Sequence, residues 1–395
     1  MKYAIIIPDG AADLPADELG GKTCLQAAET PHMDWIARNG KCGTVRNIPK
    51  GMPCGSDVAI LSVFGYDPRK YYTGRAPLEA AARGIQVDPE DWIFRCNLVT
   101  VVDGRMDDYS AGHISSPEAA ALIQELDRVL GGSHVKFHSG VGYRHLMTFR
   151  HPCNLETTPP HDILGRPIAR HLPTGEGADL VRTLIERSVD VLRTHEINTV
   201  RRDLGESPAT NIWLWGQGKM PQLPSFESIY HRKGAVIAAV DLVRGLARLI
   251  GWQLVDVPGA TGYVDTNYPG KGAAAVEALD RVDLVCVHVE APDEAGHSAD
   301  LKTKVRTIEQ IDKHVVGPVL ERLKSEGDQW RILVLPDHPT PCSVRTHTPD
   351  PVPFAIAGTR IFAVVAEPFC EETAAASDLH IPHGCELMEY LLTVR

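Results

Sequence analysis

The sequence of 395 residues lacks an excess of basic side chains, a CxxC pair and any long apolar run. Lys and Arg number 40 against 51 Asp and Glu, so the formal net charge is −11. This balance excludes the basic surface with which proteins bind nucleic acid or anionic membranes. The nine cysteines are scattered and odd in number, which is typical of reduced thiols in a cytoplasmic protein rather than of a disulfide scaffold.

The apolar stretch at the start of the chain, MKYAIIIPDG, is too short for a signal peptide or a membrane span. We therefore expect a cytoplasmic protein with no membrane partner. At a prior of roughly 150 residues per domain, the length predicts two domains, each with its own core. No internal repeat or low-complexity tract is evident, and the sequence leaves open whether the protein is a monomer or a homo-oligomer.

Short apolar runs typical of buried parallel strands occur at Tyr3–Pro8, Val282–Val289 and Arg331–Pro336. Helical spacing of apolar residues over Asp300–Leu323 places a helix between the last two runs, and helices are also predicted at Ser56–Phe64 and Gly234–Ile250. This order predicts an α/β fold in which a doubly wound sheet carries helices on both faces.

Residues 91–230 have a different character, with helical segments at Pro117–Leu130 and Gly177–Thr194 and a proline-rich passage at Thr157–His161. We expect a smaller α/β domain to be inserted there and to bind the substrate. Residues 1–90 and 231–395 would then form one discontinuous catalytic domain around it.

Polar side chains follow the predicted strands, where open α/β sheets bind their ligands. They are Asp9, then Asp293 and His297, then Asp337 and His338, with His347 further on. A single Asp-His pair is typical of a surface turn. Carboxylates and imidazoles at several strand ends together indicate a metal site, and this mixture of oxygen and nitrogen ligands suits Mn²⁺, Zn²⁺ or Mg²⁺.

Ser56 is a candidate nucleophile because it follows the Gly- and Pro-rich segment GMPCGSDV at residues 51–58 and starts a predicted helix. A helix N-terminus and a bound cation would favour its alkoxide and stabilise an attached phosphoryl group. The alternative is that Ser56 only caps the helix. Cys54 is a rival nucleophile, although hard cations do not need a thiolate.

Several motifs occur in a specific order along nearly the whole chain. They are the strand ending in Asp9, Ser56 with Asp57 and Val58, GYDP at 65–68, YTGRAPLE at 72–79, Asp293 with His297, DHPTP at 337–341, and His347 before DPVP at 350–353. This order resembles the archaeal-type cofactor-independent (2,3-bisphosphoglycerate-independent) phosphoglycerate mutases of the alkaline phosphatase superfamily.

The resemblance implies a glycolytic isomerase with an alkaline-phosphatase-like sheet and a phosphoserine intermediate on Ser56. It implies two divalent metal ions and no requirement for 2,3-bisphosphoglycerate. One ion would be held by Asp9, Ser56, Asp337 and His338, and the other by Asp293, His297 and His347. The implied partner is a small phosphorylated substrate, and 2-phosphoglycerate and 3-phosphoglycerate would be interconverted.

The sequence departs from bacterial relatives around the serine, where Gly55 replaces Asn and Ala59-Ile60 replaces Gly-His. The forms DHPTP at 337–341 and THT at 346–348 also occur in a bacterial sub-branch proposed to act as homoserine kinase. A phosphotransferase of that kind, or a phosphopentomutase or phosphatase of the same superfamily, is therefore the alternative function.

An acid or base for the glycerate hydroxyls is expected from the insert. His113 in the small-residue loop SAGHIS at 110–115 is the best candidate, because an imidazole titrates near neutrality, although a surface histidine is the alternative. Cations for the carboxylate and phosphate of the substrate are expected from basic side chains. The predicted substrate-binding residues are Arg144, His145, Arg75, Arg244 and Lys271.

Overall fold

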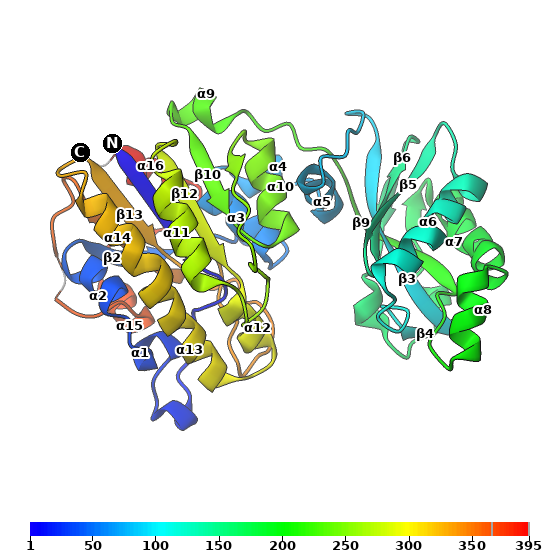
Figure 1. Ribbon diagram of the computed structural model, residues 1–395, viewed down its shortest axis with the longest axis horizontal. Helices are drawn as coiled ribbons and strands as arrows, with labels where there is room; N and C mark the ends of the chain where they lie inside the picture. The colour runs from blue at the N-terminus through cyan, green and yellow to red at the C-terminus, as the bar shows by residue number, and fades with distance from the viewer. Residues whose placement is uncertain (365, 394–395) are drawn as a thin grey trace. The chain divides into compact units, whose positions relative to one another are not determined.

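The computed structural model describes residues 1–364 and 366–393 and divides the chain into two compact units (Figure 1). Unit 1 comprises Met1–Tyr72 and Gln222–Arg395, and unit 2 comprises Thr73–Pro221. Both limits lie before those predicted for the insert, 91 and 230. Helix α5 (Arg75–Ala82) packs against strands of unit 2, whereas the ring of Phe226 makes an edge-to-face contact with Trp252 of unit 1, with ring centroids 5.0 Å apart.

Unit 1 is built on an eight-stranded sheet in the order β11-β10-β12-β1-β13-β14-β2-β15. Its strands are β1 (Lys2–Pro8), β2 (Lys41–Val45), β10 (Gly234–Ile237), β11 (Gln253–Leu254), β12 (Leu284–Val289), β13 (Trp330–Val334), β14 (Val352–Gly358) and β15 (His380–Ile381). The five strands from β11 to β13 run parallel, and β14 is antiparallel to both of its neighbours. The carboxyl ends of β12, β1 and β13 therefore meet at one edge of the sheet.

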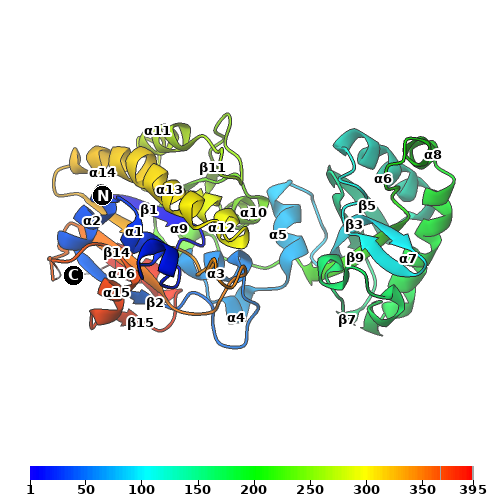
Figure 2. The same ribbon diagram turned by 90° about the horizontal axis from the view of Figure 1, so that it is seen from below.

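Helices cover both faces of this sheet, as predicted (Figures 1 and 2). They are α1 (Cys24–Ala27), α2 (Pro31–Arg38), α3 (Ser56–Val63), α4 (Pro68–Tyr71), α9 (Phe226–Tyr230), α10 (Asp241–Leu249), α11 (Tyr268–Ala278), α12 (Ala291–His297), α13 (Leu301–Ile311), α14 (Gly317–Lys324), α15 (Glu371–Ala376) and α16 (Glu386–Thr393), with a 3-10 turn η1 (Asp17–Leu19) and a π turn η4 (Asp312–Val316). One core cluster joins α2, α11, α13 and α14 to alternate residues of the strands, such as Ala4 and Ile6. Across the described ranges, no helix combines the length and apolar character that a membrane span needs.

The predicted strands at the start of the chain and before residues 290 and 337 are confirmed, as are the helices that begin at Ser56 and near residue 300. The prediction of one helix over Gly234–Ile250 is wrong. Its first part is strand β10, which pairs with β11 and β12, and α10 begins only at Asp241. A short, wholly apolar run such as GAVI does not distinguish a buried strand from a buried helix.

Unit 2 has an antiparallel sheet with β4-β3-β6-β5 in order and β9 also paired to β3. Its elements are α5, β3 (Trp92–Val102), β4 (Arg105–Asp108), α6 (Ser116–Leu130), β5 (Val135–Val141), β6 (Arg144–Phe149), β7 (Asn154–Glu156), η2 (Pro160–Ile163), η3 (Ile168–Arg170), β8 (Thr174–Glu176), α7 (Ala178–Arg193), α8 (Glu196–Asp203) and β9 (Asn211–Lys219). Helices α6 and α7 bury their apolar faces in one core with residues of β3, β6 and β9. This unit is the expected smaller α/β domain.

Candidate active site

The register of the parallel strands brings three aspartates together. Ile7 of β1 lies opposite His288 of β12, and Ile6 lies opposite Val334 of β13. Asp9, Asp293 and Asp337 follow these three strands, and all three are buried. Potential ligand atoms of Asp9 lie within 4.8 Å of those of Asp293 and His338 in one group, and of those of His288 and Asp337 in another.

Asp293 lies between two histidines whose tautomers are set by backbone carbonyls. Its Oδ2 is 3.2 Å from His297 Nε2, its Oδ1 is 3.3 Å from His347 Nε2, and the two Nε2 atoms are 3.0 Å apart. The Nδ1 of His297 lies 3.0 Å from the carbonyl oxygen of Arg345, and that of His347 lies 3.4 Å from the carbonyl oxygen of Cys54. Because a carbonyl oxygen only accepts, each neutral ring carries its proton on Nδ1 and turns the lone pair of Nε2 toward Asp293.

This arrangement calls for a positive charge between the three side chains. Hydrogen bonding to the Asp293 carboxylate raises the pKa of His297 to about 9, because it favours the charged imidazolium. A divalent cation meets the same need with both Nε2 lone pairs and the carboxylate as ligands. The sequence-predicted group of Asp293, His297 and His347 is therefore assembled in a geometry that fits an ion.

A hydrogen-bonded chain leads from Asp293 to Ser56 through two buried side chains. Thr340 Oγ1 donates to Asp293 Oδ1 at 2.5 Å, so it is left to accept from His338 Nδ1 at 3.3 Å. The other nitrogen of this ring, Nε2, is 3.0 Å from the Oγ of Ser56. Thr340 thus holds the lone pair of His338 Nε2 toward the serine.

Asp9 and Asp337 hold carboxylate oxygens that nothing in the described part of the chain satisfies. Both Asp9 oxygens and Asp337 Oδ2 are buried with no hydrogen-bond partner there, whereas Asp337 Oδ1 accepts from the backbone N–H groups of Gly10 and His338. Burial raises the pKa of Asp9, and the negative charges of Asp337, Glu290 and Asp293 raise it further. Buried carboxylates this close need a cation, so these residues also fit a divalent ion.

Ser56 stands at the first position of α3, and the capping position is Gly55. The alternative that Ser56 is the helix cap is therefore wrong. Its half-buried side chain is directed at His338 instead. Burial raises the pKa of the rival Cys54 to about 11, so that thiol stays protonated near neutrality.

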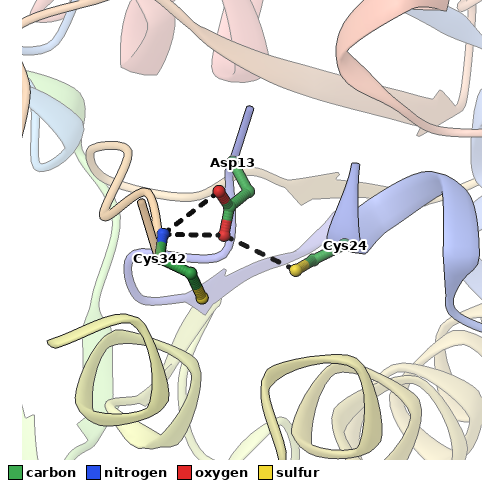
Figure 3. Close-up of side chains that lie close together, drawn as sticks. All are labelled: Asp13, Cys24 and Cys342. Carbon is green, nitrogen blue, oxygen red and sulfur yellow. Dashed lines mark hydrogen bonds between the residues drawn. The ribbon is translucent and has the colours of Figure 1, made fainter. Parts of the chain in front are cut away.

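A further cluster joins Asp13, Cys24 and Cys342 (Figure 3). Asp13 Oδ2 is 3.5 Å from Cys24 Sγ, and the backbone N–H of Cys342 donates to both carboxylate oxygens at 3.2 and 3.3 Å. The Nζ of Lys304, which is completely buried, lies 2.8 Å from the same Oδ2 and 2.8 Å from the carbonyl oxygen of Thr340. Because this ammonium already neutralises Asp13, we interpret the cluster as a clamp between the loops after β1 and β13 rather than an ion site.

Two predicted substrate-binding residues lie in unit 1. Lys271 is almost completely buried, and its Nζ donates to the carbonyl oxygen of His288 at 3.0 Å. Burial lowers the pKa of Lys271 to about 8. Arg244 pairs with Asp256 at 2.8 Å. A role for either in binding substrate stays a prediction.

His113 lies in unit 2, in a loop with unusual backbone geometry. Ala111, Gly112 and His113 all have positive φ, at 49°, 66° and 50°. Asp108 holds this loop by accepting from the N–H groups of Ser110 and Gly112, both at 2.7 Å. The His113 side chain is exposed. Left-handed conformations of residues other than glycine gather at functional sites, which is compatible with the predicted acid–base role.

The other three predicted residues of unit 2 differ in exposure. Arg75 and Arg144 are exposed, and the Nε of Arg75 is 3.8 Å from Glu79. His145 is only 1% exposed, and its Nδ1 accepts from the backbone N–H of Gly140 at 2.9 Å. Burial lowers the pKa of His145 to about 3, so the ring is neutral inside the sheet. This burial argues against direct contact between His145 and a substrate.

Sequence reasoning did not single out Thr340, Lys304 or His288. Thr340 lies inside the DHPTP motif with one partner, His338, but its other partner, Asp293, is 47 residues away. Lys304 and His288 are ionisable residues within apolar patterns, in helix α13 and strand β12. An ionisable residue at a buried position of such a pattern is the signal that could have identified both.

Comparisons with known proteins identify the family and support the fold. The model of the family "2,3-bisphosphoglycerate-independent phosphoglycerate mutase" matches residues 37–198. A protein of that name from Methanothrix thermoacetophila is 51% identical over 392 residues, covering 99% of this chain and all of the relative.

Two solved structures extend the likeness to three dimensions. A Pyrococcus horikoshii protein has a TM-score of 0.84 at 31% identity, over 99% of this chain and 96% of that one. The cofactor-independent phosphoglycerate mutase of Thermoplasma acidophilum has a TM-score of 0.69 at 28% identity, over the full length of both chains. The chain therefore belongs to the 2,3-bisphosphoglycerate-independent phosphoglycerate mutases, the family that its ordered motifs resemble.

Proposed function

We propose that this chain interconverts 2-phosphoglycerate and 3-phosphoglycerate through a phosphoserine on Ser56, with two divalent metal ions and without 2,3-bisphosphoglycerate. The observation that carries the proposal is the 3.0 Å contact between Ser56 Oγ and His338 Nε2, at the edge where the buried carboxylates converge. A glycolytic role in the cytoplasm, on a small phosphorylated substrate, belongs to the same proposal.

The proposed ion ligands fall into two sets that share the sheet edge. They are Asp9, Ser56, Asp337 and His338 for one ion, and Asp293, His297 and His347 for the other. When bound, the ions would favour the serine alkoxide and neutralise the oxygens of the phosphoryl group. Thr340 supports both sets, because it donates to Asp293 and orients His338.

The reaction consists of two phosphoryl transfers that balance each other. In the first, the Ser56 alkoxide bonds to phosphorus, the bond from phosphorus to the substrate oxygen breaks, and the released glycerate oxygen takes a proton from a general acid. In the second, the other glycerate hydroxyl gives its proton back to the same group, now a base, and bonds to phosphorus, which releases the Ser56 alkoxide. His113 is the candidate for this group that the sequence predicts. No phosphate is lost and no donor nucleotide is needed.

The test uses the purified chain with Mn²⁺, assayed on 3-phosphoglycerate and, separately, on homoserine with ATP. We expect isomerisation that a chelator abolishes and Mn²⁺ restores. Ser56→Ala should lower turnover by about a thousandfold or more, because it removes the nucleophile. The matched control is Ser62→Ala in the same helix, whose hydroxyl donates to the carbonyl oxygen of Asn47.

A second readout follows the intermediate itself. Intact-mass measurement after acid quenching should show one phosphoryl group on the wild type and none on Ser56→Ala. Full turnover by Ser56→Ala would contradict the assignment of Ser56 as the nucleophile. Phosphorylation of homoserine without isomerisation of 3-phosphoglycerate would replace the proposed function with the kinase.

A further inference from the structure

His288 is a buried histidine on strand β12 that faces Asp9. The register places His288 opposite Ile7, so Asp9, two residues beyond Ile7, emerges on the same face of the sheet. The side chain of His288 is about 1% exposed, and that of Asp9 is completely buried. The distance from His288 Nε2 to Asp9 Oδ2 is 3.0 Å.

This contact is close without being a hydrogen bond. His288 Nε2 and both Asp9 oxygens have no hydrogen-bond partner within residues 1–364 and 366–393. Asp337 Oδ2 is a third buried atom of the same kind, and atoms of Asp9, His288 and Asp337 all lie within 4.8 Å of one another. The Nε2 atom of His288 and the carboxylate oxygens of Asp9 and Asp337 thus lie close together without hydrogen bonds between them. Ligand atoms around a common ion have this arrangement.

Two imidazoles lie near different oxygens of Asp9. His338 Nε2 lies 3.7 Å from Oδ1 of Asp9, whereas His288 Nε2 lies near Oδ2. The second ring nitrogen of His288, Nδ1, is 3.9 Å from Glu290 Oε2, which is too far for a hydrogen bond, and neither atom has a hydrogen-bond partner in the described part of the chain.

We propose that His288, through Nε2, is a ligand of the ion held by Asp9 and Asp337, in addition to the seven ligands expected from the sequence. The inference rests on the proposed function only in that this ion belongs to the same site. An imidazole ligand beside two carboxylates favours Mn²⁺ or Zn²⁺ over Mg²⁺, which prefers oxygen ligands and water. His288 therefore contributes to the choice of metal.

The test is a titration of the metal-free protein with Mn²⁺ and, separately, with Mg²⁺, in the absence of substrate. The variant His288→Asn is compared with Cys286→Ala, a control at another wholly buried position of the same strand face. We expect His288→Asn to weaken binding of one Mn²⁺ ion by about a hundredfold, and binding of Mg²⁺ much less. Pulsed electron paramagnetic resonance of bound Mn²⁺ should lose one nitrogen coupling in His288→Asn and none in Cys286→Ala.

A merely structural role for His288 would give a different pattern. Equal losses for Mn²⁺ and Mg²⁺, or an unchanged Mn²⁺ affinity with all nitrogen couplings retained, would overturn the proposal. Circular dichroism spectra and melting curves establish that each variant is folded before titration. A variant too unstable to titrate is replaced by His288→Gln, which is judged by the same loss of one nitrogen coupling.

The outcome is separable from that of the proposed function. A wild type that binds Mn²⁺ through His288 but does not isomerise phosphoglycerate would refute the proposed function and leave this inference standing. A wild type that isomerises phosphoglycerate, while His288→Asn binds Mn²⁺ as tightly, would refute this inference alone.

Discussion

Replacement of Lys304 by methionine tests how much the clamp around Asp13 stabilises unit 1. Methionine keeps an unbranched apolar side chain but removes the ammonium group. The side chains of Lys304 and Asp13 are 0% and 2% exposed, so the variant leaves a carboxylate buried without its cation. Breaking a buried ion pair from one side costs about 3–5 kcal/mol. We expect Lys304→Met to lower the free energy of unfolding of unit 1 by that amount.

The second half of a double-mutant cycle removes the negative charge of Asp13, which Lys304→Met leaves buried without a cation. Asparagine at position 13 is neutral, and its amide oxygen can still accept from the backbone N–H of Cys342, as Asp13 does. The double variant Lys304→Met with Asp13→Asn should therefore recover about 1–3 kcal/mol relative to Lys304→Met alone. Lys302→Met, an exposed position in the same helix, is the control and should change stability by less than about 0.5 kcal/mol.

The assay must report on unit 1 alone, because the chain has two compact units. Native-state hydrogen exchange of the amides of β1 and β13 gives the free energy of opening of that sheet. A loss below about 1 kcal/mol in Lys304→Met, or a double variant as unstable as the single one, would refute the reasoning that the pair is buried and electrostatically coupled.

Two other predictions concern the threonine of the hydrogen-bonded chain and the buried histidine of unit 2. Thr340→Val should lower kcat by about 10- to 100-fold, whereas Thr340→Ser should retain most of the wild-type kcat, because only a hydroxyl at position 340 orients His338. Steady-state kinetics at saturating Mn²⁺ measure both variants, and equal kcat values for Thr340→Val and the wild type would exclude this role of Thr340. The pKa of His145 is about 3 in the folded protein and about 6.5 when unfolded, so the unfolded chain binds the extra proton and stability is lost as pH falls through this window. Hydrogen exchange in β3 and β6 should show that the free energy of opening of this sheet falls by about 2 kcal/mol between pH 7 and pH 5, and that His145→Asn removes this fall. The same pH dependence in the variant would contradict the attribution of this effect to His145.

The sheet edge could be predicted because buried apolar runs and the polar residues that end them are local features. Asp9 and Asp337 each follow such a run directly, and Asp293 comes four residues after the end of one. Strand β10 could not be predicted in the same way, because it owes its conformation to pairing with β11 and β12. Local sequence does not report partners that come from distant segments.

The supporting residues escaped prediction for a similar reason. The role of Thr340 depends on Asp293, 47 residues away, and that of Lys304 on Asp13, 291 residues away. The extent of unit 2 also depends on packing, because α5 joins it through contacts with β3 and β9. These relations appear only when the chain is folded.

The central position of β1 has a consequence for how the chain is made. This first strand pairs with β12 and β13, so none of its ladder hydrogen bonds can form until the ribosome has synthesised β12, which begins at Leu284. Unit 2 is continuous in sequence and can complete its own sheet earlier. During synthesis, the apolar segment that ends in the buried Asp9 therefore remains unpaired after unit 2 has folded. We expect the nascent chain to need protection from aggregation during this interval.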